Sequence, residues 1–500
     1  MQLVAYGAQD IYLTGNPQMT FFKVVYRKHT NFSMESIQQT FSGTADFGNE
    51  VVVTISRNGD LVGRMYLEHA ASFTHVVSHS SLQINIVERY GDSLIKECEI
   101  EIGGQSIDKH TSMWNRVWSD LTEFNPSGYF GATVGPGVIA PSGNGTLYQL
   151  MTGNTFGFNT GLNNGNNKFG ALANNAESKT INGIIYSNGN GGIGAPSPAQ
   201  PSQIDVNKIF LPLNFWFNRN PGLALPLIAL QYHEVKVKMT FESLGNLIRT
   251  PLSATNDHDN AAPFTISHFD TIEGNFNLWC DYIYLDIDER RRFAQVSHEY
   301  LIEQLQYSES TINSGTPSID LNFNHPVKEL IWCMRNETAG GGRHQTPGVN
   351  LGDASSGPVS LDEMRGNWQL KLNGQDRFKE RYTKYFTRTQ VWQHHTGYGG
   401  IPSLAMNQNS TGTVTACGSD SIAVYSFALK PEEHQPSGTC NFSRIDNTQL
   451  VGNTIQVPSN DGTLVSTGDA TANNTKLTIF AVNYNVLRIM SGMGGLAYSN

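Results

Sequence analysis

Apolar and polar residues alternate with a period of two in many short segments of the chain. In "EVKVKMTF" (234–241), Val235, Val237, Met239 and Phe241 alternate with charged or hydroxyl-bearing residues. The same alternation occurs in "ECEIEIGG" (97–104) and "NWQLKLNG" (367–374). A period of two is typical of strands with one face in a core and the other in water. Many such strands separated by Gly, Asn and Pro predict β-sandwiches or barrels.

Several of these segments occur twice, in the same order. "SMESIQQTF" from Ser33 is similar to "SHEYLIEQL" from Ser297, at an offset of 264 residues. "VVVTISRNGDLVGRMYL" from Val51 is similar to "IDLNFNHPVKELIWCMR" from Ile319, at an offset of 268. "IEIGGQ" and "LKLNGQ" end at Gln105 and Gln375, at an offset of 270.

The later part of each half continues the repeat. A segment of helical period follows each "GQ", and we expect each helix to turn its apolar face inward (Met113, Trp114, Val117, Trp118 and Leu121; then Tyr382, Tyr385, Phe386 and Thr389). A Phe-x3-Pro-x4-Pro motif begins at Phe217 and again at Phe427, and Tyr282 matches Tyr484. The order of these matches predicts two similar β-domains in tandem.

The repeat also divides the chain into segments. We expect an N-terminal arm at 1–25, a first domain at 26–288 and a second at 289–500, with the last strand of the first running into the first strand of the second near 286–300. The first domain carries an insertion, 128–203, which is rich in Gly and Asn and has only three charged side chains. Such a segment predicts a long surface loop.

Composition narrows the function classes. The formal net charge is −10, which argues against a large nucleic-acid surface. The five cysteines form no C-x-x-C pair, and Cys98, Cys280 and Cys333 lie in apolar strand-like segments, so we expect buried free thiols. The chain has no apolar stretch of 18 residues, and its start does not have the pattern of a secretory signal.

Candidate catalytic and metal-binding residues are few. Asp286 and Asp288 form a D-x-D pattern, but three arginines follow, which favours solvated ion pairs. No H-x-H occurs; His75 and His79 are four apart, His394 and His395 are adjacent, and we interpret both pairs as packing or surface residues. The sequence therefore predicts no catalytic, cofactor-binding or metal site, and no enzyme activity.

Two other groups of residues have conservative interpretations. The glycine clusters at 103–105 and 339–344 are not followed by Gly-Lys-Ser/Thr and are read as turns. Lys23, Arg27, Lys28 and His29 form a basic group for which we favour pairing between subunits, with contact to acidic lipid head groups left open.

Long segments resemble the major capsid proteins of large eukaryotic DNA viruses with icosahedral shells. They include "GAQDIYLTGNPQMTFFKVVYRKHTNF" (7–32), "LNFWFNRNPGLALPLIALQYHEV" (213–235), "LWCDYIYLDIDERRRFAQVSHEYLIEQLQ" (278–306) and "YSFALKPEEHQPSGTCNFSRIDN" (425–447). The resemblance covers nearly the whole chain except its loops, chiefly 128–203 and 339–360.

The resemblance implies an all-β double jelly roll: two tandem eight-stranded antiparallel β-sandwiches with short helices and long loops. It implies homotrimeric capsomers that tile an icosahedral shell, with minor capsid and penton proteins as partners, an internal membrane near the arm, and no direct contact with nucleic acid. It also implies a place in the outer capsid shell of the virion, after assembly in the host cytoplasm. The alternative from another function class is a carbohydrate-binding tandem β-sandwich protein that binds sugar through aromatic residues of the long loop.

Overall fold

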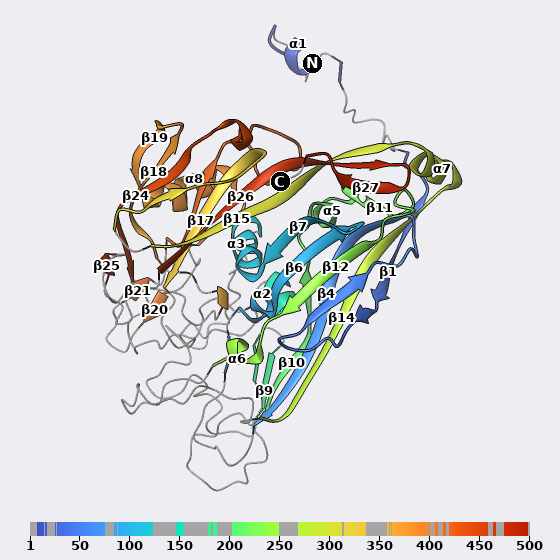
Figure 1. Ribbon diagram of the computed structural model, residues 1–500, viewed down its shortest axis with the longest axis horizontal. Helices are drawn as coiled ribbons and strands as arrows, with labels where there is room; N and C mark the ends of the chain where they lie inside the picture. The colour runs from blue at the N-terminus through green and yellow to red at the C-terminus, as the bar shows by residue number, and fades with distance from the viewer. Residues whose placement is uncertain are drawn as a thin grey trace, which may run out of the picture.

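The computed structural model describes most of the chain. The described residues are 8–14, 16–17, 26, 28–75, 85–87, 89–123, 147–154, 179–181, 184–187, 203–249, 269–312, 315–336, 358–359, 361, 363–397, 399–400, 406–408, 414–416, 420–458, 464–466 and 475–498. They form two β-sandwiches that lie side by side, one in blue to yellow-green and the other in yellow to red (Figure 1).

The first sandwich consists of two antiparallel sheets. One has the strand order β1-β14-β4-β10-β9-β8, with β11 also paired to β4, and the other has the order β2-β3-β12-β6-β7. Their bounds are β1 Phe32–Gln39, β2 Phe41–Ser42, β3 Glu50–Thr54, β4 Leu61–His75, β6 Ile95–Ile102, β7 Gln105–Thr111, β8 Lys179–Ile181, β9 Ile184–Ser187, β10 Gln203–Pro212, β11 Leu225–Pro226, β12 Val235–Phe241 and β14 Phe269–Leu285. A two-stranded sheet is separate, formed by β5 (Asn85–Ile86) and β13 (Ile248–Arg249).

The second sandwich repeats this arrangement. One sheet has the order β15-β26-β17-β22, with β23 paired to β17 and β27 to β26, and the other has the order β16-β24-β18-β19, with β25 paired to β24. Their bounds are β15 His298–Thr311, β16 Ser318–Asp320, β17 Pro326–Asn336, β18 Arg365–Leu372, β19 Gln375–Tyr382, β22 Ile422–Ser426, β23 Cys440–Asn441, β24 Thr448–Pro458, β25 Leu464–Ser466, β26 Thr475–Met490 and β27 Met493–Leu496. A second two-stranded sheet is formed by β20 (Met406–Gln408) and β21 (Val414–Ala416).

Short helices connect the strands. Most lie in the first half of the chain: α1 Ile11–Thr14, α2 Tyr90–Leu94, α3 Ser112–Thr122, α4 Leu147–Thr152, α5 Trp216–Arg219, η3 Pro221–Leu223, α6 Leu244–Leu247 and α7 Ile287–Gln295. The second half has a π-helical turn, η6 (Tyr385–Thr389), followed by α8 (Gln390–His394) and η7 (Phe442–Arg444).

Eight strands of each sandwich correspond one to one in position. The order β1-β14-β4-β10 matches β15-β26-β17-β22, and the order β3-β12-β6-β7 matches β16-β24-β18-β19. Two four-stranded sheets connected in this way form a jelly roll. The predicted all-β double jelly roll with short helices is therefore confirmed.

The predicted strand faces hold where the sequence alternates. In β12, Val235, Val237, Met239 and Phe241 are buried and the residues between them are half-buried. In β6, Cys98, Ile100 and Ile102 are buried in the same core. These side chains are buried because successive side chains of a strand point to opposite sides of the sheet.

The residue-level match between the halves was wrong, although the order of segments was right. A β-bulge follows Cys280 opposite Met65 in the first sandwich and lies at the equivalent place beside Ala481 and Leu330 in the second. Equivalent residues are thus 201 apart on β14 and β26, and 265 apart on β4 and β17, instead of 202 and 268. On β1 and β15 the separation is 269 rather than 264, because Glu35 pairs with Tyr282 and Gln304 with Asn483.

These errors are odd numbers, so they place residues on the wrong face. Tyr282 lies in the core of the first sandwich, whereas Tyr484 shares the opposite face of β26 with Phe480 and Val482. The Phe/Pro/Pro motifs lie in the same connection but are not equivalent either. Leu225 pairs with Val62 as Cys440 pairs with Val327, a separation of 215 residues rather than 210.

The border between the two halves also differs from the prediction. The last strand of the first half does not run into the first strand of the second, because α7 lies between β14 and β15. Asp286 caps this helix by accepting a hydrogen bond from the Ile287 N–H (2.7 Å). The strand thus ends where a short carboxylate side chain offers the backbone a helix start.

Parts of the chain for which we made predictions lie outside the described residues. Of the arm (1–25), the structure describes 8–14 and 16–17, and α1 lies apart from both sandwiches (Figure 1). Of the insertion (128–203), it describes α4, which is followed by β8 and β9 beside β10. The proposed boundaries of the arm, the two domains and the insertion stay predictions.

Candidate functional site

Helix α3 lies where the two sandwiches meet (Figure 1). It begins after Thr111, whose side chain accepts a hydrogen bond from the Trp114 N–H (3.3 Å) and so caps the helix. Its apolar residues recur at helical spacing, as the sequence predicted. They do not pack into the core of their own sandwich, however, but face the other one.

The contact of α3 with the second sandwich is a hydrophobic core of its own. From α3 come Met113, Trp114, Val117, Trp118 and Leu121, and from the second sandwich come Ile331, Cys333, Ile422, Val424, Phe480 and Val482. The rings of Trp114 and Phe480 are 5.2 Å apart. Burial of this much apolar surface makes the junction between the sandwiches comparable to a domain core.

Backbone hydrogen bonds add to this junction. The Asp108 carboxylate of β7 accepts from the Leu305 N–H of β15 (3.0 Å), and the Gln304 side chain donates to the Ile107 carbonyl. The Gly397 and Gly399 N–H groups donate to the carbonyls of Leu121 (2.7 Å) and Asp120 (2.8 Å). These bonds fix the orientation of one sandwich relative to the other, since apolar contact alone is not directional.

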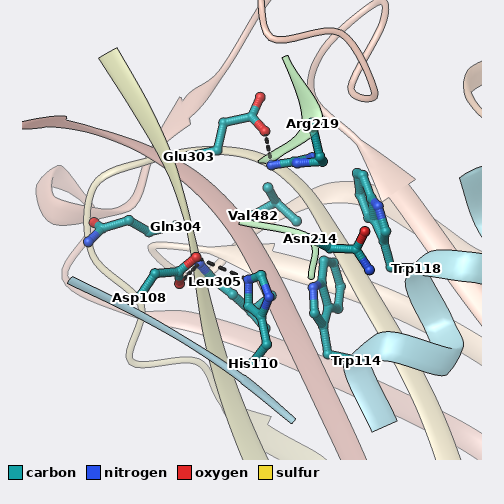
Figure 2. Close-up of a pocket in the computed structure, with 10 residues that line it drawn as sticks. All are labelled: Asp108, His110, Trp114, Trp118, Asn214, Arg219, Glu303, Gln304, Leu305 and Val482. Atoms are coloured by element: carbon teal, nitrogen blue, oxygen red, sulfur yellow. Dashed lines mark hydrogen bonds and ion pairs between the residues drawn. The ribbon is translucent and has the colours of Figure 1, made fainter. Parts of the chain in front are cut away.

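A buried ion-pair network lies at one edge of the junction. Glu303 of β15 accepts from Arg219 of the first sandwich and from Lys328 of β17, and Lys328 also donates to the Pro431 carbonyl (2.7 Å). The guanidinium of Arg219 lies 4.7 Å from the centre of the Trp118 ring. Figure 2 shows Arg219 directed toward Glu303, beside the two tryptophans of α3.

This network changes the pKa values of its members. Burial alone would raise the pKa of Glu303, but Arg219, His434 and Lys328 outweigh it and lower that pKa to about 2. Burial and the neighbouring Arg219 lower the pKa of Lys328, against the opposing effect of Glu303. Glu303 is therefore ionised at neutral pH, where it compensates the two cations.

The junction leaves almost no empty space. The small cavity in Figure 2 has a volume of about 10 Å³, and among its lining residues are His110, Asn214 and Glu303. That is room for about one water molecule, whereas small-molecule sites have several hundred Å³. Its polar groups already have partners within the chain, for example His110, whose ring lies 3.0 Å from the Asp108 carboxylate. The junction can hold the sandwiches together but cannot take up a substrate.

A second buried cluster surrounds His395. Its ring nitrogens lie 2.9 Å from Glu329 and 3.0 Å from Glu432. Burial alone would lower the pKa of His395, but the two carboxylates raise it to about 9. Thr396 next to it binds Glu432 and the Thr122 carbonyl (2.8 Å), so this cluster also contributes to the junction.

The structure also places the residues that the sequence singled out. Asp286 and Asp288 lie at the start of α7, and the neighbouring Arg290 pairs with Asp60 (2.9 Å). His394 contacts the Leu429 carbonyl (3.2 Å) and is separate from the buried His395. Gly103 and Gly104 form the turn between β6 and β7, as predicted.

Other candidates are outside the described residues, in whole or in part. His79, Lys23, Arg27 and the glycine cluster at 339–344 lie there, whereas Lys28 and His29 are exposed. Cys98, Cys280 and Cys333 are buried free thiols, as predicted, with pKa values raised by burial. Within the described ranges, no group of three His, Cys, Asp or Glu side chains could hold a metal ion, and no helix is long and apolar enough to cross a membrane.

Sequence reasoning missed the charged network of the junction. Glu303 and Lys328 interrupt otherwise apolar strands, in "YLIEQL" and "HPVKELIWC". A charged residue at such a position is a signal for a buried partner, because unpaired charges are rarely buried. Which partner it meets depends on contacts between residues far apart in the sequence.

Comparison with known proteins agrees with this geometry. The profile of the family described as "Large eukaryotic DNA virus major capsid protein" matches residues 289–495, and that of "Major capsid protein N-terminus" matches 20–129 and 196–286. The chain is 44% identical to the major capsid protein of Pyramimonas orientalis virus and 38% identical to that of Paramecium bursaria Chlorella virus 1. Both alignments cover 100% of this chain and 99% of the relative.

Solved structures show the same relationship. The chain is similar to a protein in the capsid of Paramecium bursaria Chlorella virus 1, with a TM-score of 0.62 and 33% identity over 96% of this chain and 100% of that one. It also has the fold of the Faustovirus major capsid protein, with a TM-score of 0.61 at 13% identity over 97% of this chain and 94% of that one. The chain therefore belongs to the family of major capsid proteins of large eukaryotic DNA viruses.

Proposed function

We propose that this protein is the structural major capsid protein of a large double-stranded DNA virus, and that three copies form a pseudo-hexagonal capsomer of the icosahedral shell. The observation that carries the proposal is the shared strand order of two sandwiches joined by a buried junction. A cyclic trimer of such chains presents six similar lobes, and its head-to-tail contacts close on themselves.

The rest of the proposal follows from the family resemblance. The partners are further copies of the chain, minor capsid and penton proteins, and an internal membrane surface near the arm at 1–25. The insertion at 128–203 forms part of the outer surface. The protein acts in the virion shell after assembly in the host cytoplasm and does not bind nucleic acid directly, which its net charge of −10 supports.

We further propose that the protein has no enzyme activity. The absence of a metal-binding group among the described residues and a junction cavity of about one water molecule support this role. The carbohydrate-binding alternative is not favoured by the family relationship.

Multi-angle light scattering of the purified protein tests the trimer. We expect a mass of three times 55.0 kDa that persists on dilution to about 1 μM, since obligate interfaces of this kind are extensive. A mass of 55.0 kDa at every concentration would contradict the proposal.

A further inference from the structure

The junction inside the chain has two halves, and each has a counterpart elsewhere in the molecule. The helix half is α3 of the first sandwich, and the face half is the outer face of the sheet β15-β26-β17-β22. Because the sandwiches share one strand order, the first sandwich has an equivalent outer face and the second has an equivalent helix. These counterparts do not meet within one chain.

The equivalent face is the outer side of β1-β14-β4-β10. By the structural register, Tyr66 corresponds to Ile331, Trp279 to Phe480 and Met34 to Glu303. The junction residues are buried, but Tyr66 and Trp279 are half-buried and Met34 is 52% exposed. The face thus presents two aromatic rings and a methionine, residue types that are enriched at protein interfaces.

The equivalent helix is α8 with the preceding turn η6. It follows β19 directly, as α3 follows β7. Most residues of α3 are buried, whereas Trp392 of α8 is 81% exposed. Leu429, which contacts α8 through His394, is 76% exposed.

The two strands before these helices differ in the same way. In β7 three residues are buried, including Asp108, which binds the partner sandwich. In β19 seven of the eight residues are exposed and one is half-buried. A large exposed tryptophan next to an exposed strand is unusual for a surface in water and typical of an interface.

We propose that α8 of one copy, with Trp392, docks on the β1-β14-β4 face of the next copy, at Met34, Tyr66 and Trp279. This contact repeats between copies the junction that α3 makes within the chain. It rests on the proposed trimer and names the surfaces that form it. Since the two surfaces differ, the contact is heterologous and forms a closed ring when each copy uses both.

Substitutions on the two surfaces test this assignment. Trp392→Glu would place a charge in the contact, and Met34→Arg would face the basic side chains of η6–α8, such as Lys384 and Arg388. We expect each variant to be folded and monomeric by light scattering, because both residues are exposed in the single chain. The milder Trp392→Ala should raise the dissociation constant at least about tenfold.

Leu147→Glu is the matched control. Leu147 is also 81% exposed, but it lies on α4, outside both surfaces. This variant should remain a trimer. If it dissociated as the other variants do, a general effect of surface charge would replace the proposed contact.

Mixing the two monomeric variants tests the head-to-tail geometry. Trp392→Glu retains an intact face and Met34→Arg an intact helix, so a 1:1 mixture should form a dimer of twice 55.0 kDa but no trimer. No dimer in the mixture, or a trimer of Trp392→Glu alone, would overturn the assignment. A monomeric wild type would instead contradict the proposed capsomer.

Discussion

Glu303 and Lys328 are charged side chains in a part of the molecule that excludes water. Both are at most 3% exposed, and Arg219 completes the network from the other sandwich. A buried charge is tolerated only when it is paired, so each of these residues depends on contacts made by segments distant in sequence. The alternation of apolar and polar residues predicts which face a side chain occupies, as for Val237 and Met239, but not which partner a buried charge meets.

Replacing Glu303 by Gln tests the contribution of this network. It would leave Arg219 and Lys328 without their carboxylate, and we expect the free energy of unfolding at pH 7 to fall by roughly 3 kcal/mol in urea denaturation. The folded-state pKa of Glu303, about 2, is below the ordinary value of 4.5, so its stabilisation is present above pH 4.5. The difference between wild type and variant should therefore shrink as the pH falls from 4.5 toward 2.

The matched control is Glu299→Gln on the same strand. Glu299 pairs with Arg488 at the surface (2.8 Å), where both side chains are more than half exposed. We expect a change within ~0.5 kcal/mol. Equal effects of the two substitutions, or a Glu303 effect that does not depend on pH, would show that the buried network is not stabilising.

At the scale of elements, the two tight hairpins were recognisable from sequence because their turns require special backbone angles. Gly103 and Gly104 have φ values of 59° and 84°, and Asn373 and Gly374 have 51° and 77°. Two successive positive φ values suit Gly-Gly and Asn-Gly pairs. The register between the repeated strands was not recognisable, because similar alternating segments can be aligned at several offsets.

The first hairpin also contributes to the junction. The His233 ring contacts the backbone of Gly494 in the second sandwich (2.9 Å) and lies where a side chain on Gly103 would be, 2.1 Å from an added Cβ. Around Gly104 nothing lies within 4 Å. We expect Gly104→Ala to cost about 1 kcal/mol for its backbone conformation, and Gly103→Ala roughly 1–3 kcal/mol more, since His233 must move. Thermal denaturation of both variants checks this, and equal losses would contradict a role of His233 at the junction.

At the scale of the whole molecule, the fold class and the duplication were predictable from the order of the repeated segments. The junction was not, since α3 has the same helical pattern whether it packs on its own sandwich or on the other. Nor was α7 predicted between the two halves, because its sequence follows a long strand without a break in polarity other than the capping Asp286. Packing between distant segments decided both.

The central claim is that two equivalent sandwiches in each chain let a threefold ring imitate sixfold symmetry. Single-particle electron microscopy of the purified oligomer, viewed along its symmetry axis, tests this claim most directly. We expect class averages with six lobes of similar size around a threefold axis, two from each chain. Averages with three lobes, or with two-fold symmetry, would contradict it.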